Sequence, residues 1–199
     1  MVRRMGAVLF SCALLVGSPT VASPQTPSAK TARPAGWVLN KQVDKLTDAQ
    51  AFTIVRRSNE GTASLGIHCA GGSYTAFLAV PKTVEGALTL AEVRFDKREA
   101  IGVTLQRFDE EFLVSLIGGS KTQANYVFMT DDAQKAVAGN FSADETARMG
   151  MSVVKAVQSS SQMVYRLSLV TAGSGTEATF NLSGFAQTAA PMIKECPIQ

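Results

Sequence analysis

The sequence predicts an α+β domain whose sheet is predominantly antiparallel and meander-like or sandwich-like. Segments rich in β-branched and aromatic residues alternate with turn residues such as Asn59–Gly61 and Gly71–Ser73, as in strands joined by short turns. Six or seven such segments within about 80 residues indicate an antiparallel meander. We expect strands at residues 37–39, 51–55, 64–68, 74–80, 88–95, 102–107, 112–117, 163–170 and 176–182, with 102–107 and 112–117 joined across Phe108–Glu111.

Helical spacing replaces the strand pattern after Ser142. Ser142 and Glu145 fit a capping box, in which each side chain accepts a hydrogen bond from the other residue's backbone. Apolar residues then recur at helical spacing up to Val157, which predicts a helix at about 143–157 with one face on the sheet. A second, short helix is expected at 184–195, bent or interrupted by Pro191.

The first 35 residues predict export rather than a folded domain. Residues 1–22 combine Arg3 and Arg4, a short apolar run and small residues before Ala22, the pattern of a Sec-type signal peptide. Cys12 gives only a faint likeness to a lipoprotein cleavage box. The apolar run is too short for a membrane span, so no transmembrane anchor is expected after cleavage. Residues 23–35 predict a flexible Pro/Ser/Thr linker, and residues 36–199 a single domain in the periplasm or outside the cell.

Charge argues against a nucleic-acid partner. The whole chain has 19 basic and 16 acidic residues, but four of the basic residues lie in the predicted signal peptide and linker. From Trp37 onward the balance is 15 basic to 16 acidic. The net basic charge that would favour a phosphate-backbone partner is therefore absent from the domain, and no nucleic-acid partner is expected.

Cysteine content predicts one long-range disulfide. Cys12 is lost with the signal peptide, which leaves Cys69 and Cys196. In an oxidising compartment, two remaining cysteines most simply pair. The bond would close the loop from Cys69 to Cys196, and the chain-entropy model assigns such a loop a stabilisation of about 4–5 kcal/mol. The alternative, two free thiols or half of a metal site, lacks further ligands.

No residue pattern assembles a catalytic, cofactor or metal site, and we expect a protein that is not an enzyme and has no cofactor. His68 is the single histidine and adjoins Cys69, but strand neighbours point to opposite faces. Asp109–Glu111 and Asp131–Asp132 provide paired carboxylates of the kind that glycosidases use. Asp109–Glu111 are expected on a hairpin turn, where charges are solvated, and Asp131–Asp132 before a short helical stretch, so a hydrolase using Asp109–Glu111 is the least favoured hypothesis. Gly118–Lys121 lacks the residue order of a phosphate loop.

The C-terminal segment has a structural interpretation. Phe180 and Leu182 share one strand face and are expected to be buried together. Ser183 is expected to cap the following helix, and Gly184 to allow close approach of helix and sheet. Cys196 then reaches the strand of Cys69.

Several segments also resemble the type VI secretion-associated periplasmic proteins (VasI-like). The likeness spans Trp37 to Cys196 and differs at Tyr126–Asp132, where that family has a tryptophan-bearing strand. A weaker likeness, through the C-terminal motif alone, is to the invasion-associated locus B proteins. The segments that carry the main resemblance are Trp37, Leu65–Cys69, Val93–Asp96, Val164–Arg166, Phe180–Phe185, Ala189, Pro191 and Cys196.

The resemblance implies a small periplasmic or secreted accessory protein that acts by binding another envelope or secreted protein, in association with a secretion system or a host. It supplies no catalytic motif. The alternative hypothesis is a periplasmic inhibitor or immunity protein that blocks a cell-wall-degrading enzyme with an exposed loop such as Gly118–Asn125.

Overall fold

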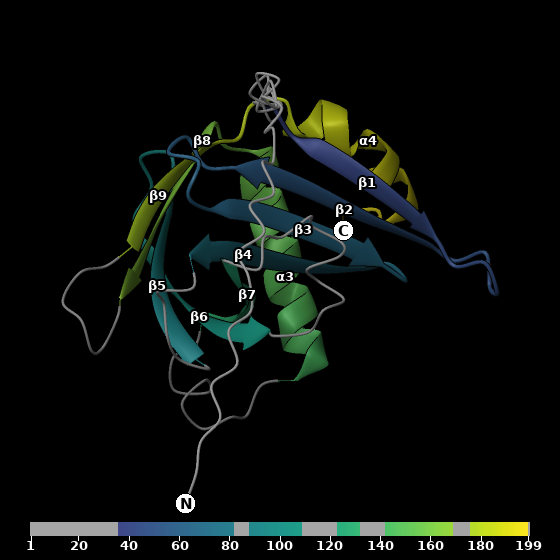
Figure 1. Ribbon diagram of the computed structural model, residues 1–199, viewed down its shortest axis with the longest axis horizontal. Helices are drawn as coiled ribbons and strands as arrows, with labels where there is room; N and C mark the ends of the chain where they lie inside the picture. The colour runs from purple at the N-terminus through teal and green to yellow at the C-terminus, as the bar shows by residue number, and fades with distance from the viewer. Residues whose placement is uncertain (1–35, 82–87, 109–122, 132–141, 169–175, 199) are drawn as a thin grey trace, which may run out of the picture. The chain divides into compact units, whose positions relative to one another are not determined.

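A nine-stranded antiparallel sheet organises the domain, with strand order β1-β2-β3-β4-β7-β6-β5-β8-β9 (Figure 1). The structure is a computed structural model, and it describes residues 36–81, 88–108, 123–131, 142–168 and 176–198. All of these fall in the unit from Pro34 to Gln199. The strands are β1 Val38–Val43, β2 Gln50–Arg57, β3 Ser64–Ala70, β4 Ser73–Pro81, β5 Leu88–Phe95, β6 Ile101–Phe108, β7 Gln123–Thr130, β8 Gln162–Ser168 and β9 Thr176–Asn181.

The predicted fold class is confirmed, while the strand order departs from a simple meander. β1 to β4 follow one another, but β4 pairs with β7 and β5 pairs with β8. The chain therefore fills the middle of the sheet in reverse order, β7-β6-β5. The strand expected at 112–117 lies outside the described residues, and the described neighbour of β6 is β7.

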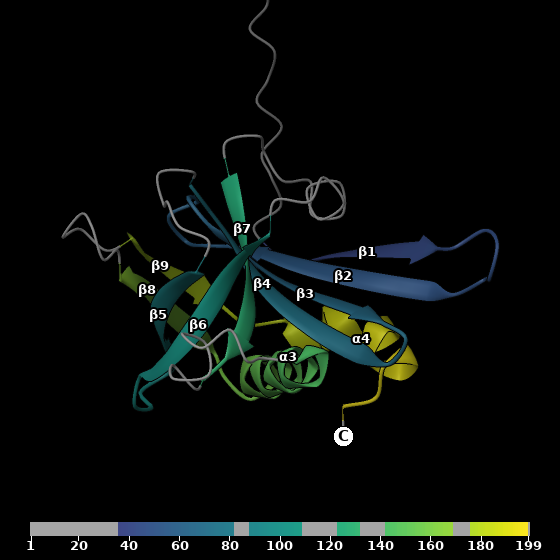
Figure 2. The same cartoon turned by 90° about the horizontal axis from the view of Figure 1, so that it is seen from below.

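Two helices cover one face of this sheet (Figure 2). α3 (Ala143–Gln158) packs on β4 and β7, and α4 (Phe185–Glu195) packs on β1 and β2. The expected capping box of α3 is present: Ser142 Oγ accepts from the Glu145 N–H at 3.2 Å, and Glu145 Oε2 accepts from the Ser142 N–H at 3.0 Å. α4 continues through Pro191 without interruption.

The core lies between these helices and the covered face. Alternate strand residues point into it, and the largest fully buried ones include Ile54, Leu65, Tyr74 and Tyr126. α3 comes so close to β4 that a Cβ at Gly150 would lie 2.2 Å from the carbonyl oxygen of Tyr74. A glycine at this helix position is therefore a packing requirement.

The connection from β9 to α4 differs in two details from the prediction. Phe180 and Leu182 are buried as expected, at 0% and 1% exposure. Ser183, however, does not cap the helix: its N–H donates to Asn181 Oδ1 at 2.9 Å, and the N-cap residue is Gly184, without a side-chain cap. Gly184 has a φ of 82°, and a Cβ there would meet only Gln187, at 4.0 Å. Glycine is thus needed for its left-handed backbone and not for close approach.

Candidate functional site

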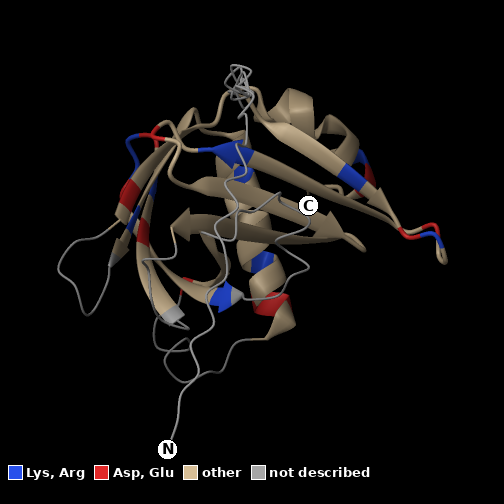
Figure 3. Ribbon diagram, viewed as in Figure 1, with Lys and Arg blue, Asp and Glu red and all other residues tan. Residues whose placement is uncertain are grey.

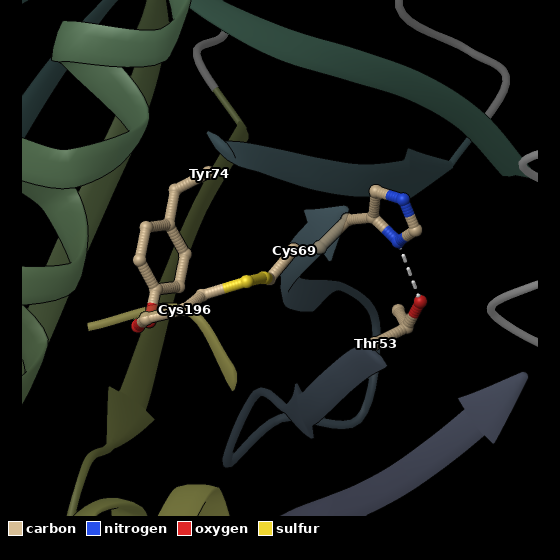
Figure 4. The surroundings of a disulfide bond; sticks show 5 residues. Thr53, Cys69, Tyr74 and Cys196 are labelled. Carbon is tan, nitrogen blue, oxygen red and sulfur yellow. Dashed lines mark hydrogen bonds between the residues drawn. A yellow bond between two sulfur atoms is a disulfide. The ribbon is translucent and has the colours of Figure 1, made fainter. Parts of the chain in front are cut away.

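The adjacent residues His68 and Cys69 point to opposite faces of β3, as expected: Cys69 points toward Cys196 (Figure 4), whereas His68 pairs with Thr53. Cys69 faces the helices and is joined to Cys196, with 6.6 Å between the Cα atoms. His68 Nδ1 lies 2.9 Å from Thr53 Oγ1 on the other face. Partial burial lowers the pKa of His68 below its usual value of 6.5. This geometry excludes a Cys–His nucleophile pair and gives His68 a cross-strand partner.

The cystine forms part of an anchor for the C-terminal segment. The Tyr74 hydroxyl donates to the Cys196 carbonyl oxygen, and the Trp37 Nε1–H donates to the Leu182 carbonyl oxygen at 3.2 Å. Burial raises the pKa of Tyr74. These contacts hold α4 on the sheet and serve structure.

The carboxylates that the sequence singled out do not form a site within the described residues. Asp131 lies exposed in a bend after β7. Asp109–Glu111, Asp132 and Gly118–Lys121 lie outside the described residues. Across the same described ranges, no group of three His, Cys, Asp or Glu residues is placed to hold a metal ion.

The proposed inhibitory loop Gly118–Asn125 needs a correction at its C-terminal end. Gln123–Asn125 form the first residues of β7, and both Ala124 and Asn125 are 3% exposed. These strand residues cannot enter another protein's cleft, because pairing with β4 and β6 holds them in the sheet. The part of the loop before Gln123 lies outside the described residues.

A charged row crosses the exposed face of β5, β8 and β9. Arg166 lies 3.1 Å from Glu177 and 3.7 Å from Glu92, beside a hollow of about 190 Å³. The three residues are register partners. All three side chains are at least half exposed, so the ion pairs add little stability. Arg94 also lines the hollow, so its two acidic and two basic residues balance and leave no net charge that would attract a charged ligand.

An apolar hollow of about 290 Å³ lies between α3 and the turn from β5 to β6. Its floor includes Phe95 and Met149, which are 6% and 8% exposed, and Ile101 on its margin is 45% exposed. Arg98 and Glu99 also line it. The described residues thus offer a shallow apolar depression with both charge signs at its margin.

The two edges of the sheet differ in accessibility. At β9, the turn between β2 and β3 covers the outer edge: the Asn59 N–H donates to Thr179 O at 2.8 Å, and the Thr179 N–H donates to the Glu60 carboxylate at 3.1 Å. At the opposite end of the sheet, five of the six residues of β1 are exposed and Leu39 is half-buried. β1 is therefore the accessible edge strand.

The backbone of β1 presents hydrogen-bonding groups outward at alternate residues. The Asp44 N–H donates to the Ala49 carbonyl oxygen at 2.9 Å, one step beyond the last register pair, Val43 and Gln50; hydrogen-bonded pairs alternate with non-hydrogen-bonded pairs along an antiparallel hairpin. Leu39, Lys41 and Val43 thus fall in non-hydrogen-bonded pairs with β2. Their N–H and C=O groups point away from β2.

Apolar side chains accompany this edge along the β1–β2 hairpin. Val38, Val43 and Leu46 are 38%, 48% and 96% exposed, and they are three of the five large exposed apolar residues among the described ones. In Figures 1 and 2 the hairpin turn extends beyond α4 and beyond the ends of β3 and β4. The sequence predicted a strand at residues 37–39, which covers only Val38 and Leu39 of β1, and nothing in a single sequence shows which strand lies at an open edge.

No family model, no curated protein and no solved structure matches this chain. Within the described ranges, no helix has both the length and the hydropathy to cross a bilayer. Among the described residues, the exposed β1–β2 hairpin is the feature that points to a function.

Proposed function

We propose that this chain is a non-enzymatic accessory protein of the periplasm or the extracellular space that acts by binding another envelope or secreted protein. The observation that carries the proposal is the β1–β2 hairpin, which exposes Val38, Val43 and Leu46 beside an open strand edge. Exposed apolar residues next to unpaired backbone groups are a liability in a protein that has no partner. A protein surface that covers the hairpin removes that liability.

Two sequence features support the cellular setting of the proposal. The N-terminal pattern up to Ala22 is that of a secretory signal peptide, and the paired cysteines suit an oxidising compartment. The resemblance to type VI secretion-associated periplasmic proteins points to a secretion apparatus as the setting. Mass spectrometry of the protein from cells tests the first point: a mature chain beginning at Ser23 in the periplasmic or culture fraction is expected.

Site-specific photo-crosslinking in intact cells tests the binding function. A photoreactive residue replaces Leu46, whose side chain is 96% exposed at the hairpin turn. The matched control replaces Lys155, an exposed residue of α3. We expect one discrete crosslinked protein from position 46 and none of that size from position 155. Equal or absent crosslinking at both positions, with normal export of both variants, contradicts the proposed role of the hairpin.

A further inference from the structure

We infer that β1 binds its partner by strand addition: an extended, antiparallel segment with an acidic residue opposite Lys41 and apolar residues opposite Leu39 and Val43. This inference rests on the proposed protein-binding function and specifies the chemistry that the partner presents. Added strands obtain affinity from main-chain hydrogen bonds and specificity from alternate side chains.

The backbone of β1 fixes which partner residues carry the hydrogen bonds. The outward N–H and C=O groups belong to Leu39, Lys41 and Val43, as the hairpin register requires. An antiparallel segment that pairs with all three residues forms six main-chain hydrogen bonds. The partner residues opposite these three positions project to the same face of the sheet, because directly opposed residues share a face.

Lys41 sets the charge of the partner. It is the one charged residue of β1 (Figure 3), and its Nζ lies 5.7 Å from the ring centroid of Phe52, its register partner. The Lys41 side chain thus lies on the helix-bearing face of the sheet, the face that Leu39 and Val43 share with it. A carboxylate directly opposite gains a cross-strand ion pair.

The same lysine argues against a second copy of this chain as the partner. Two copies of β1 related by a two-fold axis form the most hydrogen bonds when Lys41 lies opposite Lys41, since Leu39 then pairs with Val43 on both sides. That register places like charges directly opposite each other, which is destabilising. Lysine on an edge strand is a common device against self-pairing. A segment with an acid at the central position has no such penalty.

Peptide binding to the purified full-length chain tests the inference. The probe is Thr-Val-Thr-Glu-Thr-Val-Thr, acetylated and amidated, titrated to millimolar concentration and followed by the backbone amide NMR shifts of β1. The control peptide has Lys in place of Glu. We expect the Glu peptide to bind about fivefold more tightly at low salt, the ratio to shrink at high salt, and Lys41→Glu to reverse the preference. Equal affinities for both peptides overturn the charge assignment.

Two further probes test the main-chain pairing itself. N-methylation of the central Glu removes a donor that pairs with β1 and is expected to abolish binding, whereas N-methylation of the next Thr modifies an outward N–H and is expected to be tolerated. Val43→Pro removes an outward donor of β1 without breaking a hydrogen bond to β2, so it is expected to prevent binding at an unchanged thermal midpoint. Equal effects of the two methylations overturn strand addition.

The outcomes separate this inference from the proposed function. If position 46 crosslinks to a protein but the peptides cause no NMR shifts in β1, the protein-binding function stands and strand addition is rejected. If the Glu peptide binds but no crosslinked protein is found in cells, the strand-addition site stands and the proposed cellular role is rejected. A concentration-dependent dimer in sedimentation that Val43→Pro dissociates identifies a second copy as the occupant and overturns the acidic-segment assignment.

Discussion

The indole N–H of Trp37 donates a 3.2 Å hydrogen bond to the carbonyl oxygen of Leu182, across 145 residues of sequence. The same indole lies against Phe185, with the ring centroids 5.0 Å apart in an edge-to-face arrangement. Trp37 is 8% exposed and immediately precedes β1. The residue just before the sheet thus holds the start of α4, and the open edge strand begins at a fixed point.

Replacing Trp37 separates its hydrogen bond from its packing. Trp37→Phe keeps an aromatic ring but leaves the Leu182 carbonyl oxygen without its donor, which is expected to lower the free energy of unfolding by about 1–3 kcal/mol. Trp37→Ala also removes buried area and is expected to cost about 3–5 kcal/mol. Urea denaturation measures both values. A Phe variant as stable as the original contradicts a stabilising role for the hydrogen bond.

The cystine is expected to stabilise the whole domain, because it joins β3 to the C-cap residue of α4 over a separation of 127 residues. Cys69→Ser and Cys196→Ser are each expected to cost about 4–5 kcal/mol in the chain-entropy model. The double variant is expected to cost no more than either single variant, since all three remove the same bond. Thermal unfolding with and without reductant measures the effect. Additive losses would show that the two cysteines do not act as a pair.

Two glycines test the packing of α3 on the sheet. A Cβ at Gly150 would lie 2.2 Å from the Tyr74 carbonyl oxygen, whereas a Cβ at Gly102 would meet nothing within 4 Å. Gly150→Ala is therefore expected to lower the free energy of unfolding by about 1–3 kcal/mol through overpacking. Gly102→Ala, on the exposed part of β6, is expected to be neutral or stabilising by up to about 1 kcal/mol. Equal effects in urea denaturation would contradict the close approach.

Local sequence signals predicted the elements whose two faces differ. β3 alternates in burial from Ile67 onward, with half-buried His68 between buried Ile67 and buried Cys69, and α3 begins at a capping box, so both were identifiable from nearest neighbours alone. β7 lacks this signal because every residue from Ala124 to Thr130 is buried. A strand buried on both faces has no period of two along its sequence.

Features set by distant contacts could not be predicted. The pairing of β4 with β7, and hence the position of β1 at an open edge, depends on which strands meet in space. The helix cap was misassigned for a local reason: the Asn181 side chain accepts the Ser183 N–H in an Asx turn, and the N-cap of α4 is Gly184. The exposure of Leu46 likewise follows from how far the hairpin projects.

Asp96 is expected to make stability depend on pH in the acidic range. Its Oδ1 accepts from Ser161 Oγ at 2.8 Å and from the N–H groups of Ser161 and Gln162 at 3.0 Å, which fastens the turn after β5 to the start of β8. The Ser161 hydroxyl first, and then these amides, lower the pKa of Asp96 below 3.8. Because the folded-state pKa is depressed, the stabilisation is fully present above pH 3.8 and is lost as the pH falls through the lower, folded-state value.

Asp96→Asn tests this pH dependence without straining the backbone, because asparagine tolerates the left-handed φ of 52° at this position. We expect the variant to have a lower thermal midpoint than the original protein at neutral pH, and the difference to shrink as the pH falls below 3.8. Asp48→Asn is the matched control, because Asp48 is also left-handed, with φ 57°, and is exposed. A difference for Asp96→Asn that stays constant from neutral pH down to strongly acidic pH would show that the charge of the carboxylate does not contribute.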